Sequence, residues 1–221
     1  MTKQSKSLPD AGRRNEASRK AILTAAFDLV GEVGFAKLSI EAIAARAGVG
    51  KQTIYRWWPS KGTVLFDAFL MLSEDHASGD PALPDTGDIE ADLKTVLRAT
   101  VDELNDARYD EPLRALNTEI VHDPELAAAY AERLHEPMRR IKRDRLRRAQ
   151  EAGQLDADTD LDLAVELLWS PLLNRWLQRT GPLTAEYADR VVEAALHGLR
   201  PRTEAASHTR TGQAAGKPSR G

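Results

Sequence analysis

Apolar residues recur at helical spacing along almost the whole chain, and strand-like alternation never lasts more than a few residues. In residues 16–33, one face carries Ile22, Leu23, Ala26, Phe27, Val30 and Val33. The spacing predicts an all-α fold of about nine helices. We expect them at 16–33, 39–47, 50–57, a segment opened by Pro59 and Ser60, 88–106, 111–121, 124–151, 159–180 and 184–199. Pro137 and Pro171 lie inside two of these segments and predict kinks or breaks there.

Polar segments divide the chain into domains. Residues 1–14 and 201–221 are rich in Ser, Thr, Gly, Pro and Arg, so we expect a disordered basic arm and a disordered tail. Residues 76–87, HASGDPALPDTG, form the clearest interior loop. We therefore expect a three-helix domain over 15–62 and a larger helical domain over 63–200.

The composition excludes several classes of protein. The chain contains no cysteine, which excludes a disulfide scaffold, a thiol nucleophile and thiolate-bound zinc. Its apolar runs fall far short of the roughly 18–20 residues that span a bilayer. The basic N-terminus has no apolar segment behind it, so it does not read as a secretory signal. We expect a cytoplasmic protein with no membrane partner.

Charge is distributed unevenly along the chain. Residues 1–62 carry 11 Lys and Arg against 5 Asp and Glu, whereas residues 63–199 carry 15 against 28. A basic N-terminal block on an acidic body favours a polyanionic partner, although solvated tails are also often basic.

The segment 39–58, SIEAIAARAGVGKQTIYRWW, has the spacing of a helix-turn-helix. Ala44 supplies the small residue where the two helices meet, and Gly48 tolerates a positive φ at the tight turn. Ile54 packs the second helix back on the first, with Ser39 as the N-cap of the first. The outward face of the second helix then carries hydrogen-bond donors that suit phosphates and base edges: Lys51, Gln52, Thr53, Tyr55 and Arg56.

Short helix pairs broken by glycine are common, so the spacing alone leaves DNA binding and a plain helical pair as alternatives. The run AILTAAFDLVGEVGFAKLSIEAIAARAGVGKQTIYRWWPSKGTVL adds a resemblance. It is similar to the DNA-binding domain of the TetR family of bacterial transcriptional regulators over residues 19–65. Residues 124–200 resemble, more loosely, the ligand-binding and dimerisation domain found in that family.

The resemblance implies a homodimer that places two recognition helices in successive major grooves of a palindromic operator. It also implies a small-molecule effector that shifts the protein toward a state of lower DNA affinity. Positions that contact DNA in the family correspond here to Ser39, Lys51, Gln52, Thr53, Tyr55, Trp57 and Lys61. Arg56 is a further candidate contact, from the outward face of the second helix. The chain departs from the usual pattern at Gly50, where a capping Ser or Thr is common, at Gln52 and at Trp57-Trp58.

The effector would lie between residues 111–138 and the helix at 159–180. Candidate walls are Leu116, Ile120, Leu134, Met138, Trp169, Leu172 and Trp176, and candidate polar anchors are Asn117, His122 and Arg175. Apolar walls with few anchors suit a lipophilic or aromatic effector. Most of these residues could equally be ordinary core.

The helix at 159–180 is apolar on more than one face, so it must bury two sides. We expect it to form a dimer interface with the last helix through Leu163, Leu173, Leu177, Tyr187, Val191, Val192, Ala195 and Leu196. The alternative is a central core helix of a monomer.

Other clusters point away from metals and catalysis. Asp156–Asp162 imitates a calcium loop, but its sixth position is Leu161 rather than glycine, and an acidic helix start explains the cluster. The five histidines lack metal-site spacing. The basic run Arg139–Arg148 is either an anion contact or a helix face that pairs with nearby acids. We expect no enzyme, metal or cofactor. The favoured function is a TetR-like, ligand-responsive repressor, and the alternative is an architectural helix-turn-helix protein without an effector.

Overall fold

A computed structural model describes residues 11–76 and 82–200 of the chain. Within them every regular element is helical: α1 (Ala11–Val33), η1 (Phe35–Lys37), α2 (Ile40–Ala47), α3 (Lys51–Tyr55), α4 (Lys61–His76), α5 (Ile89–Asn105), α6 (Ala107–His122), α7 (Pro124–Tyr130), η2 (Ala131–His135), α8 (Glu136–Glu151), α9 (Leu161–Gln178) and α10 (Ala185–Leu199). Helices α7, η2 and α8 follow one another without a gap and form one continuous helical segment. Counted in this way, the described residues contain nine helical segments besides the single-turn η1. The predicted all-α fold is confirmed.

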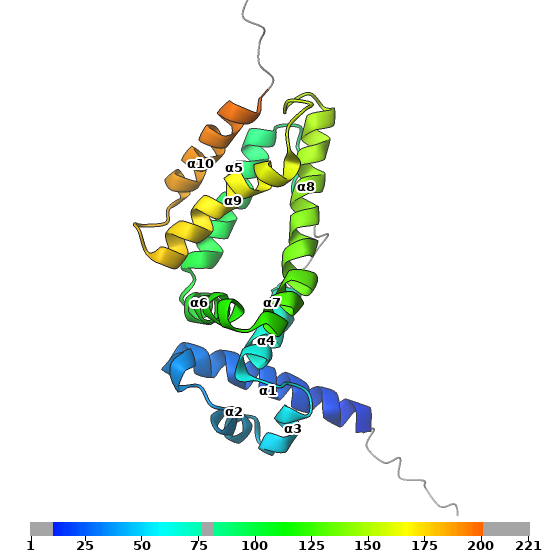
Figure 1. Ribbon diagram of the computed structural model, residues 1–221, viewed down its shortest axis with the longest axis vertical. Coiled ribbons are helices and arrows are strands. Elements are labelled where there is room, and N and C mark those ends of the chain that lie inside the picture. The colour runs from blue at the N-terminus through cyan, green and yellow to red at the C-terminus, as the bar shows by residue number, and fades with distance from the viewer. Residues whose placement is uncertain (1–10, 77–81, 201–221) are drawn as a thin grey trace, which may run out of the picture.

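The molecule has a small lower end and a longer upper body. Figure 1 shows α1, α2 and α3 at the lower end, with α5, α8, α9 and α10 forming the body. Between them lie α6 and α7, and α4 rises from the lower end to meet them. The two parts are therefore joined by packed helices.

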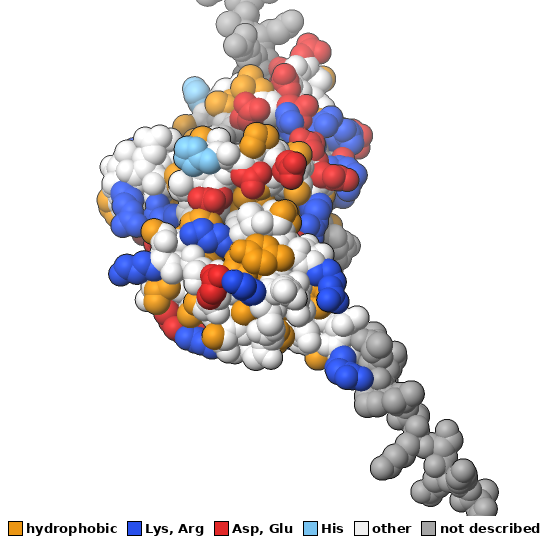
Figure 2. Space-filling model, turned by 60° about the horizontal axis from the view of Figure 1, so that its bottom comes forward, with side chains coloured by type: hydrophobic (Ala, Val, Ile, Leu, Met, Phe, Trp, Pro, Cys, Tyr) orange, Lys and Arg blue, Asp and Glu red, His pale blue; other side chains and the backbone are white. Residues whose placement is uncertain are grey.

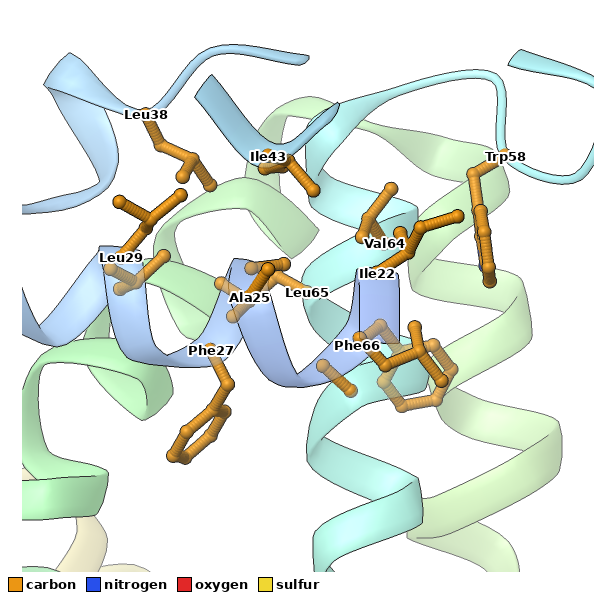
Figure 3. Packing of buried hydrophobic residues seen from close by; sticks show 14 of the residues in the cluster. Ile22, Ala25, Phe27, Leu29, Leu38, Ile43, Trp58, Val64, Leu65 and Phe66 are labelled. Carbon is orange, nitrogen blue, oxygen red and sulfur yellow. The ribbon is translucent and has the colours of Figure 1, made fainter. Parts of the chain in front are cut away.

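Side chains of α1, α2, α3 and α4 form the first of two hydrophobic cores. Ile22, Ile43, Ile54 and Val64 are completely buried in it. Figure 3 shows labelled side chains of α1, α2 and α4 that belong to this core. The core continues into Leu116 of α6 and into α7. The expected boundary at residue 62 separated α4 from the helix-turn-helix, but the packing joins them.

A second core holds the upper body together. It consists of apolar side chains from α5, α9 and α10 and from the C-terminal half of α8. Beside it, Arg145 of α8 is 1% exposed and donates to Asp92 of α5 at 2.7 Å, while its Nε donates to the carbonyl of Pro84. Burial alone would raise the pKa of Asp92, but hydrogen bonds from Arg145 and Thr86 outweigh it and hold that pKa below its ordinary value. This pair fixes the segment before α5 onto α8.

Several predicted boundaries need correction. Helix α1 begins at Ala11, so residues 11–14 are helical and not part of a disordered arm. Extending an existing helix by one turn costs little, because nucleation is already done and Ala and Arg are good helix formers. Residues 1–10 and the expected tail at 201–221 lie outside the described residues.

Helix α6 begins at Ala107 and not at residue 111. Asp106 caps it by accepting from the amide of Arg108, which leaves Pro112 inside the helix. Pro137 lies at the start of α8, directly after the π-helical turn η2, in which the amide of Glu136 reaches the carbonyl of Ala131. The expected irregularity is therefore present at Pro137, whereas α9 continues through Pro171 without a break.

Candidate functional site

The first helix of the predicted helix-turn-helix is held at both ends by local contacts. Ser39 accepts a hydrogen bond from the amide of Ala42 at 3.1 Å, as predicted for an N-cap. Gly48 closes the helix with φ 67° and ψ 32°, a left-handed conformation that glycine adopts without strain. Ala44 is 5% exposed at the contact between the helices. These residues set the angle at which α3 leaves the turn.

The second helix, α3, is short and anchored by one side chain. Ile54 is completely buried, whereas Tyr55 is 53% exposed. Lys51, Gln52 and Arg56 are also exposed, and Thr53 is half-buried. The ammonium of Lys51 lies 3.5 Å from the carboxylate of Glu41, a contact between two exposed groups that DNA phosphates could replace. The predicted donors thus lie on the outer side of α3.

Two neighbouring tryptophans follow α3 and behave differently. Trp58 is 3% exposed, and its ring meets that of Trp57 edge-on with centroids 5.4 Å apart. Trp57 is only half-buried. Trp57 is therefore the one that can reach a partner.

Lys61, one of the predicted DNA contacts, also makes contacts within the protein. Its ammonium donates to the carbonyls of Phe35 at 2.8 Å and Leu38 at 3.2 Å, and it lies 4.3 Å from the centre of the Phe35 ring. The charge is therefore used within the protein, where it ties the start of α4 to the segment before α2. These contacts position the segment before α2, and the phosphate contact expected of Lys61 stays a prediction.

A polar junction that the sequence did not indicate lies at Asp67 of α4. Its carboxylate accepts from Trp58 Nε1 at 2.9 Å, from Arg19 Nη2 at 3.0 Å and from Arg133 Nη1 at 2.7 Å. Burial alone would raise the pKa of Asp67, but these three hydrogen bonds outweigh it and hold the pKa below its ordinary value. One carboxylate thus joins α1, the segment after α3, and η2.

The surface near the helix-turn-helix carries cationic side chains. In Figure 2, blue Lys and Arg side chains border the lower end of the molecule, and most of the red acidic ones in that view lie above it. This distribution suits a polyanion that approaches the lower end.

The comparisons with known proteins agree with this geometry. Residues 22–68 match the family model for bacterial regulatory proteins of the tetR family, and residues 83–195 match that for a tetracyclin repressor-like C-terminal domain. The chain is 31% identical over 186 residues to the uncharacterized HTH-type transcriptional regulator YdeS of Bacillus subtilis, covering 84% of this chain and 91% of YdeS. The chain belongs to the TetR family. It is accordingly a DNA-binding transcriptional regulator of a family that does not consist of enzymes.

Two further TetR-family proteins extend the similarity over most of the chain. The DNA-binding transcriptional repressor TetR of Mycobacteroides abscessus is 29% identical, with 83% of this chain and 94% of that protein covered. The crystal structure of the TetR family transcription regulator SCO0332 superimposes with a TM-score of 0.66 at 34% identity, covering 83% of this chain and 99% of the other. The similarity therefore includes the regulatory half that TetR-family proteins place after the helix-turn-helix.

The predicted pocket residues are divided between the two hydrophobic cores. Leu116, Ile120 and Leu134 belong to the first core, whereas Trp169, Leu172 and Trp176 belong to the second. Leu116, Leu172 and Trp176 are closely packed, with exposures of 1%, 0% and 4%. Such low exposures are those of ordinary core residues, which is the alternative that the sequence left open for them.

The polar and peripheral pocket candidates are also placed elsewhere. Asn117 donates to the carbonyl of Leu113 on its own helix. Arg175 donates to the carbonyl of Pro182 and stacks over the ring of Tyr187 at 4.1 Å. His122 and Met138 are exposed. Of the predicted walls, Trp169 is half-buried and keeps a face that a ligand could contact.

Sequence reasoning missed Lys142, which lies against that tryptophan. Its ammonium is 4.4 Å from the centre of the Trp169 ring. Burial of the ammonium lowers the pKa of Lys142 to about 8, against an opposing effect from Glu103. In the sequence, Lys142 is one more member of a basic run on a helix. Only the packing of α8 on α9 shows that its ammonium is buried against Trp169.

Most other cations of that run pair with acids. Arg139 and Arg143 approach Asp162, and Arg148 reaches Asp85. The run is therefore better described as a helix face that pairs with nearby acids than as an anion contact. Asp160 caps α9 by accepting from the amides of residues 162 and 163, which accounts for part of the acidic cluster.

The predicted dimer residues divide into two groups. Leu163, Leu173 and Leu177 of α9 are 51%, 40% and 39% exposed, and Leu167 beside them is 45% exposed. Val192, Ala195 and Leu196 are instead buried in the second core, so the structure contradicts their assignment to an interface. Helix α10 turns that face toward α5 and α9, and only Tyr187 and Val191 stay half-exposed.

Two absences concern the described ranges 11–76 and 82–200. None of the helices there combines the length and the apolar character that a bilayer crossing requires. The same ranges contain no group of three or more acidic or histidine side chains gathered as for a metal ion.

Proposed function

We propose that this TetR-family regulator is a ligand-responsive repressor that binds a palindromic operator as a homodimer. The observation that carries the proposal is the outward display of Lys51, Gln52, Tyr55 and Arg56 on a helix that is anchored by the buried Ile54. A helix held in this way can enter a major groove with its donors leading.

The proposed DNA contacts are Ser39, Lys51, Gln52, Thr53, Tyr55, Arg56 and Trp57. Lys51 and Gln52 head α3 and suit base edges, because a lysine pairs with guanine and a glutamine amide pairs with adenine. Tyr55, Trp57 and Ser39 suit phosphates, which fix the register of the protein on the duplex. Lys61 supports the set from inside the protein through the carbonyls of Phe35 and Leu38.

The proposed dimer uses the exposed leucines of α9. Four leucines of this helix are each about 40–50% exposed. Together they form an apolar surface that a monomeric protein seldom leaves in contact with water. Packing this face on a second copy, beside Tyr187 and Val191 of α10, would remove it from water. A two-fold axis there would set the two α3 helices at the spacing of a palindromic site.

The proposed effector binds in the regulatory half, near Trp169. A lipophilic or aromatic body suits the indole, and the ammonium of Lys142 above it favours a ligand that also carries negative charge. Repression is supported by the Mycobacteroides abscessus relative, which is named a repressor. Because the target is genomic DNA, the proposed place of action is the cytoplasm.

Footprinting the purified chain on the DNA that flanks its own gene tests the proposal. We expect a protected site with two-fold symmetry, lost on titration with one compound from small-molecule pools in a saturable manner. Protection that no compound reverses would favour the architectural helix-turn-helix alternative. Absence of any sequence-specific protection would contradict the proposal.

A further inference from the structure

A hollow lies where the DNA-binding end meets the regulatory half, between α1, α4 and η2. Its volume is about 380 Å³, within the range of sites that hold small molecules. The walls combine apolar side chains, Leu23, Leu70 and Met71, with a charged rim. The residues that line the hollow include none of those predicted for the effector pocket, and neither Lys142 nor Trp169.

The rim carries more positive than negative charge. Arg19, Lys20 and Arg133 face it, against the carboxylates of Glu16 and Asp67. Asp67 is already bound by three donors, including both arginines. The balance therefore favours an anion at the rim.

Both arginines keep hydrogen-bonding capacity. Arg19 and Arg133 each give Asp67 a single nitrogen, and their side chains remain 53% and 45% exposed. A guanidinium has five N–H groups in a planar fork that matches a carboxylate, so each can bind a second carboxylate while it holds Asp67.

We propose that this hollow is a second ligand site, which binds a small organic monocarboxylate with an apolar body. The carboxylate lies between Arg19 and Arg133, and the apolar body lies against Leu23, Leu70 and Met71.

The position gives such a ligand a route to the recognition helix. Arg133 lies in η2, and π-helical turns occur frequently at functional sites. A ligand carboxylate that shares Arg19 and Arg133 with Asp67 weakens their hydrogen bonds to Asp67, which also accepts from Trp58 in the segment after α3. This effect on DNA affinity rests on the proposed function, whereas binding in the hollow does not.

The methionines of the chain make a direct test, because there are three and they lie far apart in the sequence: Met1, Met71 and Met138. Met71 lines the hollow, and Met138 is exposed on α8. The full-length protein, labelled with ¹³C at the methionine methyls, is titrated with 2-naphthoate and with decanoate, without DNA. We expect the Met71 signal to shift saturably with at least one of them, while the Met138 signal stays in place. A shift of Met138 without Met71, or no shift with either compound, would overturn the proposal.

Variants of the rim test the charge requirement. We expect Arg133→Gln and Arg19→Gln each to weaken binding about tenfold or more, as expected for a charge-assisted hydrogen bond. Arg133→Lys should retain part of the affinity, and Arg140→Gln, which removes an exposed arginine of α8 outside this hollow, should leave it unchanged. The uncharged 2-naphthalenemethanol should bind at least tenfold more weakly than 2-naphthoate.

Equal binding of the alcohol and the acid, or equal loss in the rim and Arg140 variants, would contradict the site. If one of the two arginine variants fails to fold, the other variant and the comparison of the alcohol with the acid still test the charge requirement. Operator binding, measured separately without these compounds, fails only if the proposed function is wrong, so the two results are distinguishable.

Discussion

Asp67 and Lys61 show how single polar side chains hold the DNA-binding end in place. Asp67 joins α1, η2 and Trp58, and Lys61 joins η1 to α4. Both are charged residues on a helix, and a sequence pattern assigns such residues to solvent or to a ligand. Their partners lie 9 to 66 positions away, so only the folded chain identifies them.

Lys51 is the residue whose loss should most clearly alter DNA recognition. We expect Lys51→Ala to weaken operator binding by about 1–3 kcal/mol and to relax the preference at one base pair, because it removes a base-edge donor. The slope of log affinity against log salt should fall by up to about one unit if the ammonium also neutralises a phosphate. Quantitative footprinting at several salt concentrations measures both effects.

Arg140→Ala is the matched control, because it removes one exposed cation from the regulatory half. It should change neither the base preference nor the affinity. If Lys51→Ala behaved like this control, Lys51 would lie outside the interface.

Lys142 should make stability depend on pH in the alkaline range. Its pKa is about 8 in the folded chain and 10.5 when unperturbed, so between these values the unfolded chain binds more protons and the stability rises with pH. Replacing Lys142 with Met removes the buried charge. The variant should be more stable than the wild type by about 1–3 kcal/mol at pH 7, and the difference should shrink between pH 8 and 10.5.

Chemical denaturation of both proteins at pH 7, 8, 9 and 10.5 measures the difference. A stability difference that stays constant over this range would show that Lys142 has the same pKa in the folded and unfolded chain.

At the scale of elements, local signals predicted the helix-turn-helix well. The cap at Ser39, the glycine at the turn and the buried Ile54 all act within a few residues of one another, so their effects are visible in the sequence. The starts of α1 and α6 were missed because one extra helical turn on a polar segment has no apolar signature. For α10, the sequence showed apolar residues but not what they pack against, and only the packing shows that Val192 faces the protein's own core.

Gly48 should be the costliest small substitution in the turn. Its φ of 67° disfavours any residue with a Cβ, although no atom lies within 4 Å of the added carbon. We expect Gly48→Ala to destabilise the chain by about 1–2 kcal/mol and to weaken operator binding, because the angle between α2 and α3 depends on it.

Gly31→Ala serves as the comparison, because Gly31 lies inside α1 with equally open space. It should stabilise by about 0.5–1 kcal/mol. Thermal unfolding measures both variants, and equal changes of the same sign would show that the turn conformation is not what Gly48 supplies.

At the scale of the whole molecule, the exposed leucines of α9 are the basis of the proposed dimer. We expect Leu167→Glu to raise the dimer dissociation constant at least tenfold, or about 1.4 kcal/mol, because two carboxylates would face each other near the two-fold axis. Sedimentation velocity over a range of concentrations measures the change.

Val121→Glu provides the control, since Val121 is 77% exposed on α6, outside the α9 face. It should leave the dimer unchanged. An unaltered oligomeric state in Leu167→Glu would remove α9 from the interface.

Entry of α3 into the major groove is tested by site-directed cross-linking. The chain has no cysteine, so Gln52→Cys carries the only thiol, which can be joined to a photoactivated cross-linker. We predict cross-links to bases in the two halves of the protected site, whereas the same reagent on Arg140→Cys should give none. Cross-links from Arg140→Cys but not from Gln52→Cys, in a complex that still forms, would contradict the account.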